Sequence, residues 1–344
     1  MCDRPLKGFK IGYTKNNKPD YLICSPDVKY VWKGKNGVWN KSYDYSRSDF
    51  ADCMEVVKDY QLIPCGSCIS CRVARAGELA DRCMLEMNYH DRACFVTFTY
   101  DDDHIITYNY TRTDTGETGC AATLFKKHYQ DFFKRLRKAY PDCDVRYVLC
   151  GEYGEHTDRP HYHGIIFGYR PSDLKIYSFN KRMQPLYTSE ELNKLWKQGF
   201  CIIGEVTKDS ANYVARYVTK KLYADLGIEN YQNIGRIPPF IVTSKRPAIG
   251  KRWYDDNKDW CFEHQISYPT DSGGRSFNAP RYFKKLRDKE GNTKYTVIDD
   301  LRNEVNASQF NHLRDLNNQT YKEMADAKDR VAEARNKAFK RDKI

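Results

Sequence analysis

The sequence lacks long hydrophobic runs. No stretch approaches the roughly 18 apolar residues that a membrane-spanning helix needs, so we expect no membrane segment. Residues 1–5 carry no apolar segment of the kind found in signal peptides, so we also expect no secretory signal. The chain has no internal repeat and no low-complexity tract. Its 13 cysteines are odd in number, and without an export signal they favour a reducing cytoplasm over a disulfide scaffold.

Positive charge and aromatic side chains are abundant instead. The 344 residues allow one to three domains and carry a formal net charge of +11. Aromatic residues make up 14% of the chain, 27 of them tyrosines, which argues against disorder over most of its length. A basic protein suits a polyanionic partner, and nucleic acid is the commonest one. Interleaved tyrosine, phenylalanine and arginine residues favour that interpretation, because bases stack on such side chains.

The spacing of apolar residues predicts mixed strands and helices. We expect strands over residues 94–100, 145–150, 164–167 and 200–206. We expect helices over residues 72–90, 124–139, 188–197 and 210–226, the third opened by a capping box of Thr188 and Glu191. This order suits an α+β fold in which helices cover one face of an antiparallel sheet.

Four segments follow from these patterns. They are an N-terminal segment with a cysteine cluster and a helix (1–90), a core (91–228), an irregular basic and aromatic region (229–298) and a long charged helix (299–344). The last segment has one weak apolar stripe, and we assign it no chemistry.

Two histidines share one predicted strand. His161 and His163 are two positions apart, so both imidazoles point to one face of a strand that begins at 161. Glu152 ends the preceding strand, and a hairpin would bring it near His161. This donor set leaves positions open for a substrate oxygen and suits Mg²⁺ or Mn²⁺. Glu155 and His156 are alternative third ligands, and two idle strand-edge histidines are the plainer interpretation of the pair alone.

Two tyrosines lie one turn apart on the predicted helix 210–226. Tyr213 and Tyr217 share a face, and Lys220 lies on that face as well. A phenol with a pKa of about 10 is a weak nucleophile at neutral pH. A nearby metal and ammonium group can stabilise its oxyanion and the attacked phosphate. Taken alone, the two tyrosines would more simply be core residues of an amphipathic helix.

The order of these motifs resembles that of the HUH endonucleases, in which a histidine–hydrophobic–histidine motif precedes a helical tyrosine motif. Tyr162 occupies the middle position here. Over residues 60–255 the chain is similar to the replication initiation proteins of gokushovirus-type Microviridae. The segments that carry this likeness are residues 64–72, 95–102, 151–154, 159–164 and 213–218.

The resemblance implies an HUH nuclease core and rolling-circle chemistry. One of the two helical tyrosines attacks single-stranded origin DNA, keeps the 5′ phosphate and frees a 3′-OH primer. The two histidines and Glu152 hold Mg²⁺ or Mn²⁺, and Lys220 orients the phosphate. Such a protein works in the cytoplasm of a bacterial host with a helicase and a polymerase. The alternatives are a transposase or relaxase of the same chemistry, and a non-catalytic, zinc-stabilised nucleic-acid-binding protein.

A cluster of cysteines predicts a second metal site. Cys65, Cys68 and Cys71 follow one another at three-residue spacing. Three thiolates this close can bind Zn²⁺ with a fourth ligand, for which Cys24 is our first choice and Cys2 our second. Free thiols at a junction between a loop and a helix are the alternative.

Basic stretches are expected to contact phosphates. The segment 244–254 is the best candidate because aromatic side chains adjoin its charges. The residues that we expect to bind DNA are Arg72, Lys245, Arg246, Lys251, Arg252 and Trp253.

Overall fold

The computed structural model describes residues 2–15, 19–44, 52–154, 157–221, 228–270, 273–292 and 320–338, and the single positions 301, 305, 308 and 312. The side chains of residues 216–221, 228–230 and 336–338 lie outside the described part. The chain divides into two compact units, one of residues 1–72 and 292–340 and one mainly of residues 73–291. The four segments expected from the sequence stay a prediction. No helix in the described ranges is long and apolar enough to cross a membrane.

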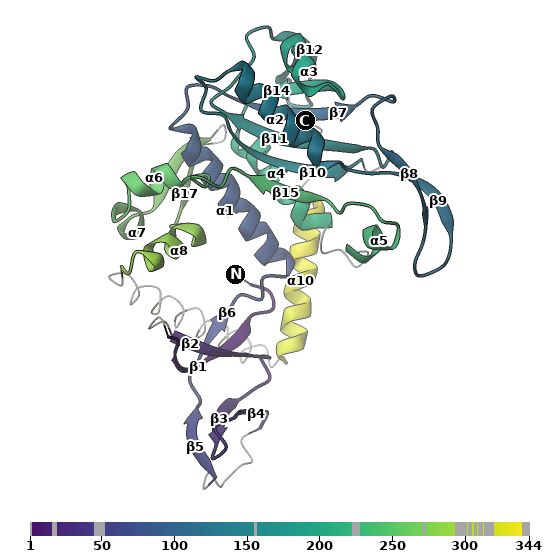
Figure 1. Cartoon of the computed structure of the whole chain (residues 1–344). Helices are drawn as coiled ribbons and strands as arrows, with labels where there is room; N and C mark the ends of the chain where they lie inside the picture. Colours follow the sequence, from purple (N-terminus) through teal and green to yellow (C-terminus); the bar gives the residue numbers. More distant parts are fainter. Residues whose placement is uncertain are drawn as a thin grey trace. The chain divides into compact units, whose positions relative to one another are not determined.

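A seven-stranded antiparallel sheet forms the centre of the second unit (Figure 1). The four predicted strands are confirmed as β7 (Ala93–Tyr100), β10 (Arg146–Tyr153), β11 (Pro160–Phe167) and β14 (Gly199–Gly204). Three further strands, which the sequence analysis does not predict, are β12 (Lys175–Phe179), β13 (Pro185–Thr188) and β15 (Phe240–Thr243). The order β12-β13-β14-β7-β11-β10-β15 places the strongly apolar β7 and β11 in the interior of the sheet.

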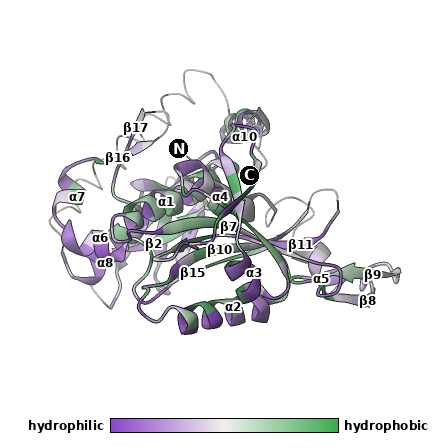
Figure 2. Ribbon diagram, turned by 90° about the horizontal axis from the view of Figure 1, so that it is seen from above, coloured by the Kyte–Doolittle hydropathy of each residue, from purple (hydrophilic) through white to green (hydrophobic). Residues whose placement is uncertain are grey.

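Helices cover both faces of this sheet, and Figure 2 shows them on its two sides. On one face, Phe98 and Trp196 belong to a large aromatic core with α2 and α3. On the other face, Phe95 and Val214 belong to a second core with α1 and α4. The expectation of helices on one face only is therefore wrong. Side chains alternate along a strand, and β7 is apolar on both sides, so each face needs a cover. The helices are α1 (Ile69–Met87), α2 (Lys126–Ala139), α3 (Glu190–Trp196) and α4 (Lys208–Lys221).

The start of α3 differs from the predicted capping box. Ser189, and not Thr188, is the N-cap, and its hydroxyl accepts a hydrogen bond from the Leu192 amide at 3.0 Å. Glu191 instead accepts a hydrogen bond from the Tyr169 hydroxyl. The predicted end of the last helix, residues 222–226, lies outside the described residues.

The region 228–290 is mostly regular, although the sequence analysis expects it to be irregular. Its short elements surround a small core in which Trp253, Tyr254 and Phe283 pack together. These elements are α5 (Ile228–Asn233), α6 (Lys251–Asp256), α7 (Trp260–Glu263), β16 (Ile266–Thr270), β17 (Gly273–Phe277) and α8 (Arg281–Lys289). The expected loop or hairpin over 101–122 is a hairpin of β8 (Thr107–Thr111) and β9 (Thr118–Ala122).

One buried carboxylate ties three elements of this unit together. Asp81 of α1 accepts hydrogen bonds from Arg275 of β17 at 2.7 and 2.9 Å and from the Tyr268 hydroxyl of β16 at 2.7 Å. It also forms an ion pair with Lys208, the first residue of α4. Burial alone would raise the pKa of Asp81, but the hydrogen bonds from Arg275 and Lys208 hold that pKa below its ordinary value. The start of α4 is thereby fixed to α1.

The first unit consists of two three-stranded sheets and a helix. β1 (Leu6–Tyr13) pairs with β2 (Pro19–Cys24) and β6 (Tyr60–Ile63), and β3 (Tyr30–Gly34) pairs with β4 (Trp39–Ser42) and β5 (Cys53–Val57). The predicted C-terminal helix is represented by α10 (Tyr321–Ala338), which buries Met324 and Ala325. Of its expected earlier part, positions 301, 305, 308 and 312 are helical.

Candidate active site

The β10–β11 hairpin places two histidines and a glutamate on one face of the sheet. In its antiparallel register Glu152 lies directly opposite His161, and Cys150 lies opposite His163. Paired residues point to the same face, and so do residues two positions apart on one strand. The three polar side chains therefore gather on the face that α4 covers.

Both imidazoles turn their Nε2 atoms toward the carboxylate. Glu152 Oε1 lies 2.8 Å from His161 Nε2 and 2.8 Å from His163 Nε2. His161 Nδ1 lies 3.0 Å from the Arg159 carbonyl oxygen, and His163 Nδ1 lies 2.8 Å from Thr97 Oγ1. Because a carbonyl oxygen only accepts, His161 Nδ1 carries a proton, and the Nε2 atom of the neutral ring is free to bind a cation. Partners behind the rings thus fix the orientation of both histidines.

Burial and charge set the protonation states of this group. The side chains of Glu152 and His163 are 1% and 6% exposed, whereas that of His161 is 19% exposed. Burial alone would raise the pKa of Glu152, but the two imidazoles hold it below its ordinary value. Burial lowers the pKa of His163 against the opposing effect of Glu152. An ionised carboxylate and neutral imidazoles are the forms that bind metal ions.

The three side chains fit a divalent cation. One ligand atom from each lies within 4.8 Å of the others. Glu152 Oε2 is buried and has no hydrogen-bond partner among the described residues. A buried carboxylate oxygen without a partner is costly, and a cation would satisfy it. Two imidazoles and one carboxylate leave coordination positions for a substrate oxygen.

Helix α4 brings a tyrosine to this group. The Tyr213 hydroxyl lies 3.4 Å from His163 Nε2, and the two rings are nearly perpendicular with centroids 4.9 Å apart. Phe95 of β7 packs against both rings, at centroid distances of 5.9 Å to His163 and 6.3 Å to Tyr213. The buried residues Ala211 and Val214 hold α4 on the sheet and so position Tyr213 over the histidine.

Several residues predicted for this site cannot be placed. The side chains of Tyr217 and Lys220 lie outside the described part, which contains only their helical backbone. The alternative ligands Glu155 and His156 are also outside the described residues. The sequence analysis misses Thr97, which holds His163 and would be found from the pairing of β7 with β11.

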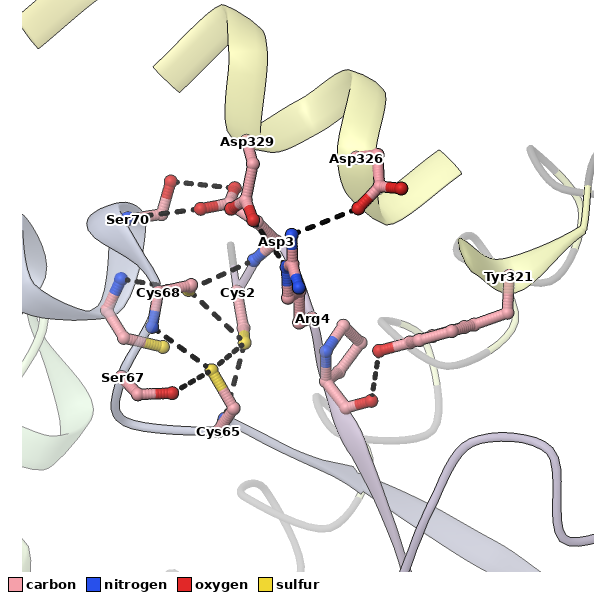
Figure 3. A network of polar contacts seen from close by, with 12 residues as sticks. Cys2, Asp3, Arg4, Cys65, Ser67, Cys68, Ser70, Tyr321, Asp326 and Asp329 are labelled. Atoms are coloured by element: carbon pink, nitrogen blue, oxygen red, sulfur yellow. Dashed lines mark hydrogen bonds and ion pairs between the residues drawn. The ribbon is translucent and has the colours of Figure 1, made fainter. Parts of the chain in front are cut away.

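Four cysteines of the first unit form a second group, drawn in Figure 3. Cys2 Sγ lies 3.5 Å from Cys65 Sγ and 3.7 Å from Cys68 Sγ, and with Cys71 all four ligand atoms lie within 4.8 Å of one another. The amides of Cys65, Cys68 and Cys71 each donate a hydrogen bond to a sulfur of the group. Burial opposes ionisation of Cys65, but hydrogen bonds from Cys68 and Ser67 lower its pKa to about 6. The group therefore favours thiolates.

The fourth thiol of this group is Cys2, our second choice, and not Cys24. Cys24 is 3% exposed and packs with Phe9 in the core of the first unit. Its position at the end of β2, opposite Lys7 of β1, keeps it in that core. Burial there raises the pKa of the Cys24 thiol. The expectation of Cys24 as the fourth ligand is therefore corrected.

The residues after Cys2 connect this group to the start of α1 and to α10. Arg4 forms ion pairs with Asp326, at 3.0 Å, and with Asp329 of α10 (Figure 3). Asp3 accepts hydrogen bonds from the amide and the hydroxyl of Ser70 at 3.1 and 2.8 Å. Cysteine geometry, the N-terminal residues and α10 are thus parts of one packed region.

The expected DNA contacts differ in their surroundings. Lys245 and Arg246 are exposed after β15, whereas Lys251 and Arg252 are in ion pairs with carboxylates. Trp253 is 9% exposed and stacks on a core phenylalanine, so the expectation that its ring stacks on DNA bases is wrong. Arg72 is half-buried in the first turn of α1.

Comparisons with known proteins agree with this arrangement. Residues 93–222, from β7 to the end of α4, match the sequence family described as replication-associated protein ORF2. The chain is 32% identical over 254 residues to replication-associated protein ORF2 of Spiroplasma virus 4, covering 72% of this chain and 74% of that protein. It is 34% identical over 237 residues to replication-associated protein VP4 of Bdellovibrio phage phiMH2K, covering 69% and 70%.

A more distant relative and the solved structures complete the comparison. The chain is 28% identical over 274 residues to replication-associated protein ORF4 of Chlamydia phage 1, covering 74% of this chain and 62% of that protein. No solved structure matches the chain significantly. The resemblance to Microviridae replication initiation proteins is confirmed by these relatives. The chain therefore belongs to the family of phage replication-associated proteins that includes them.

Proposed function

We propose that this protein is a tyrosine-dependent HUH endonuclease that cuts and rejoins single-stranded DNA at a replication origin. The observation that carries the proposal is the position of Tyr213, whose hydroxyl lies 3.4 Å from His163 Nε2 beside a group suited to a divalent cation. The role in phage replication that the relatives' names give agrees with this chemistry.

The residues of the chain prepare the reaction before DNA arrives. His161, His163 and Glu152 would hold Mg²⁺ or Mn²⁺, which polarises the scissile phosphate when bound. The hydrogen bonds of the two rings to Arg159 and Thr97 keep them in place, so little reorganisation is needed.

The covalent step is a transesterification. The phenolic oxygen forms a bond to phosphorus, the bond from phosphorus to the 3′ oxygen breaks, and the phenolic proton passes to solvent. The 3′-OH so freed can prime synthesis, and the phosphotyrosine ester keeps the energy needed for later rejoining. Tyr213 is the first nucleophile in this proposal. Tyr217, one turn along α4, would act in a second cleavage, and Lys220 would stabilise the phosphate.

A covalent capture experiment tests the proposal. The protein is incubated with a randomised single-stranded DNA library and Mn²⁺, denatured in detergent, and analysed by sequencing and peptide mass spectrometry. We expect DNA attached to Tyr213, with no adduct in EDTA or in His161→Ala, and no Tyr213 adduct in Tyr213→Phe. Tyr177→Phe, which changes an exposed tyrosine of β12, is the matched control and should leave the yield unchanged.

The same experiment separates the competing functions. DNA binding without an adduct in any divalent metal would refute the nuclease and favour a non-catalytic nucleic-acid-binding protein. Adducts that resolve only by joining to a second, different DNA would favour a transposase or relaxase. If the proposal holds, we expect the enzyme to act in the host cytoplasm, where a host helicase and polymerase extend the freed 3′-OH.

We also propose that Cys2, Cys65, Cys68 and Cys71 hold a structural Zn²⁺. Four thiols within 4.8 Å of one another, with amide hydrogen bonds to their sulfurs, suit the tetrahedral thiolate site that zinc prefers. Elemental analysis of the purified protein should find one zinc per chain. Cys2→Ser should lose it, and Cys24→Ser should keep it. Zinc retained in Cys2→Ser and lost in Cys24→Ser would contradict the assignment.

A further inference from the structure

An exposed phenylalanine lies in the same row of the sheet as the metal-binding group. Glu152 pairs with His161, His161 pairs with Thr99, and Thr99 pairs with Phe200. Directly paired residues point to the same face of an antiparallel sheet. The four side chains therefore form one row across β10, β11, β7 and β14, on the face that carries Tyr213.

Phe200 is exposed although it sits at the start of a central strand. Its exposed fraction is 42%, and no ring contact of Phe200 occurs among the described residues. The following residue, Cys201, is fully buried on the opposite face. A large apolar ring left in water costs free energy, so a ligand that covers it would gain from the contact.

The backbone before Phe200 is built to hold it at this place. Gly199 has φ +141°, and a Cβ atom there would lie 2.3 Å from the Thr99 carbonyl oxygen and 2.5 Å from the Asp101 amide nitrogen. Only glycine permits so close an approach of the two backbones. The start of β14 is therefore held tightly against β7, and Phe200 has a defined position in the row.

The register also gives the separation of Phe200 from the proposed reaction centre. Neighbouring strands are about 4.8 Å apart, so His161 and Phe200 are separated by about 10 Å. Stacked nucleotides advance about 3.4 Å each along a strand. The ring thus lies within about three nucleotides of a phosphate held beside His161.

We propose that Phe200 is a stacking platform for one base of the single-stranded DNA substrate, near the cleaved phosphate. This inference rests on the proposed endonuclease function. A base is the occupant that fits, because the ring continues the row of the cation-binding group and the chain carries a net charge of +11. Thr99, half-buried between His161 and Phe200, offers a hydroxyl to the backbone of the same strand.

Two measurements test the platform, the first independent of cleavage. Fluorescence anisotropy in EDTA gives the Kd for a labelled oligothymidylate. Phe200→Ala should weaken binding by about 5- to 150-fold, the range for one base on an aromatic side chain, and Phe200→Trp should restore it. Phe125→Ala is the matched control, since Phe125 is 40% exposed and lies on the opposite face, where its backbone holds the Tyr162 hydroxyl.

The second measurement locates the base. In an oligonucleotide recovered by covalent capture, each nucleotide near the cut is replaced in turn by an abasic site, and the rate of adduct formation is measured. One abasic position should slow the wild type and leave Phe200→Ala without a further loss, because the same contact is missing already.

The outcomes separate this inference from the proposed function. If no DNA is captured by the wild type, the endonuclease proposal fails, and the anisotropy series still decides the role of Phe200. If the wild type forms adducts while Phe200→Ala binds as tightly as Phe125→Ala and every abasic loss persists in it, the stacking platform is refuted. A loss in Phe200→Ala that Phe200→Trp does not restore also contradicts it.

Discussion

Replacing Asp81 by asparagine should destabilise the second unit by about 3 kcal/mol. Removal of one partner from a buried ion pair costs roughly 3–5 kcal/mol, because the other charge is left buried without compensation. Lys208 is in that situation, since its side chain is only 12% exposed. Arg275 is 41% exposed and can be hydrated instead, so the lower end of the range applies.

Calorimetric melting measures this effect. For a unit of this size, 1 kcal/mol shifts the melting temperature by about 2–4 °C, so we expect a decrease of roughly 6–12 °C. Asp144→Asn is the matched control, because its ion pair with Arg252 has side chains that are 51% and 39% exposed. It should produce a small fraction of the Asp81→Asn shift.

The pH dependence provides a second test. The pKa of Asp81 is held below its ordinary value in the folded chain, so its contribution to stability is complete above the unfolded pKa of about 3.9. That contribution is lost as the pH falls through the lower folded pKa. In urea unfolding, the difference between wild type and Asp81→Asn should be constant near neutral pH and close below about pH 4. A difference that persists unchanged into acid, or the absence of one at pH 7, would refute the reasoning.

Three further predictions follow from other sites. Glu152→Gln should abolish the rise in melting temperature that Mn²⁺ causes, a stabilisation of about 2.7 kcal/mol at a hundredfold excess over Kd, and an undiminished rise would contradict the metal site. Gly199→Ala should cost about 1–3 kcal/mol in urea unfolding, because a Cβ would lie 2.3 Å from the Thr99 carbonyl oxygen; an unchanged unfolding midpoint would contradict this. Ser189→Ala should cost about 1 kcal/mol in the same assay and Thr188→Ala much less, the reverse order being incompatible with Ser189 as N-cap.

The sequence predicts those elements whose buried side chains repeat over several turns or pleats. β7 alternates over eight residues, and α2 buries one face over fourteen, so the type of both elements can be read from the pattern. β13 and β15 have four residues each, and α7 also has four, which is too short for a period to develop. Helices on both faces of the sheet could have been inferred from β7, because its two sides are equally apolar.

The candidate site is predictable to the extent that it is local. His161, His163 and Glu152 lie on adjacent strands of one hairpin, so spacing alone brings them near one another. The choice between Cys2 and Cys24 depends on how β1 and β2 pair, which spacing along the chain does not reveal. In the same way, the burial of Trp253 depends on residues far along the chain, which pack around it in a separate small core.

The hairpin that carries Glu152 and His161 has a consequence for the order in which the protein assembles. These two residues are 9 positions apart, whereas Tyr213 is 50 positions from His163. Contacts of short sequence separation form early and cheaply, and distant ones require the closure of a longer loop. The cation-binding group can therefore mature while α4 is still unattached or not yet synthesised. Covalent capture of DNA, the step that commits the protein to a strand, is reserved for chains in which the helix has docked.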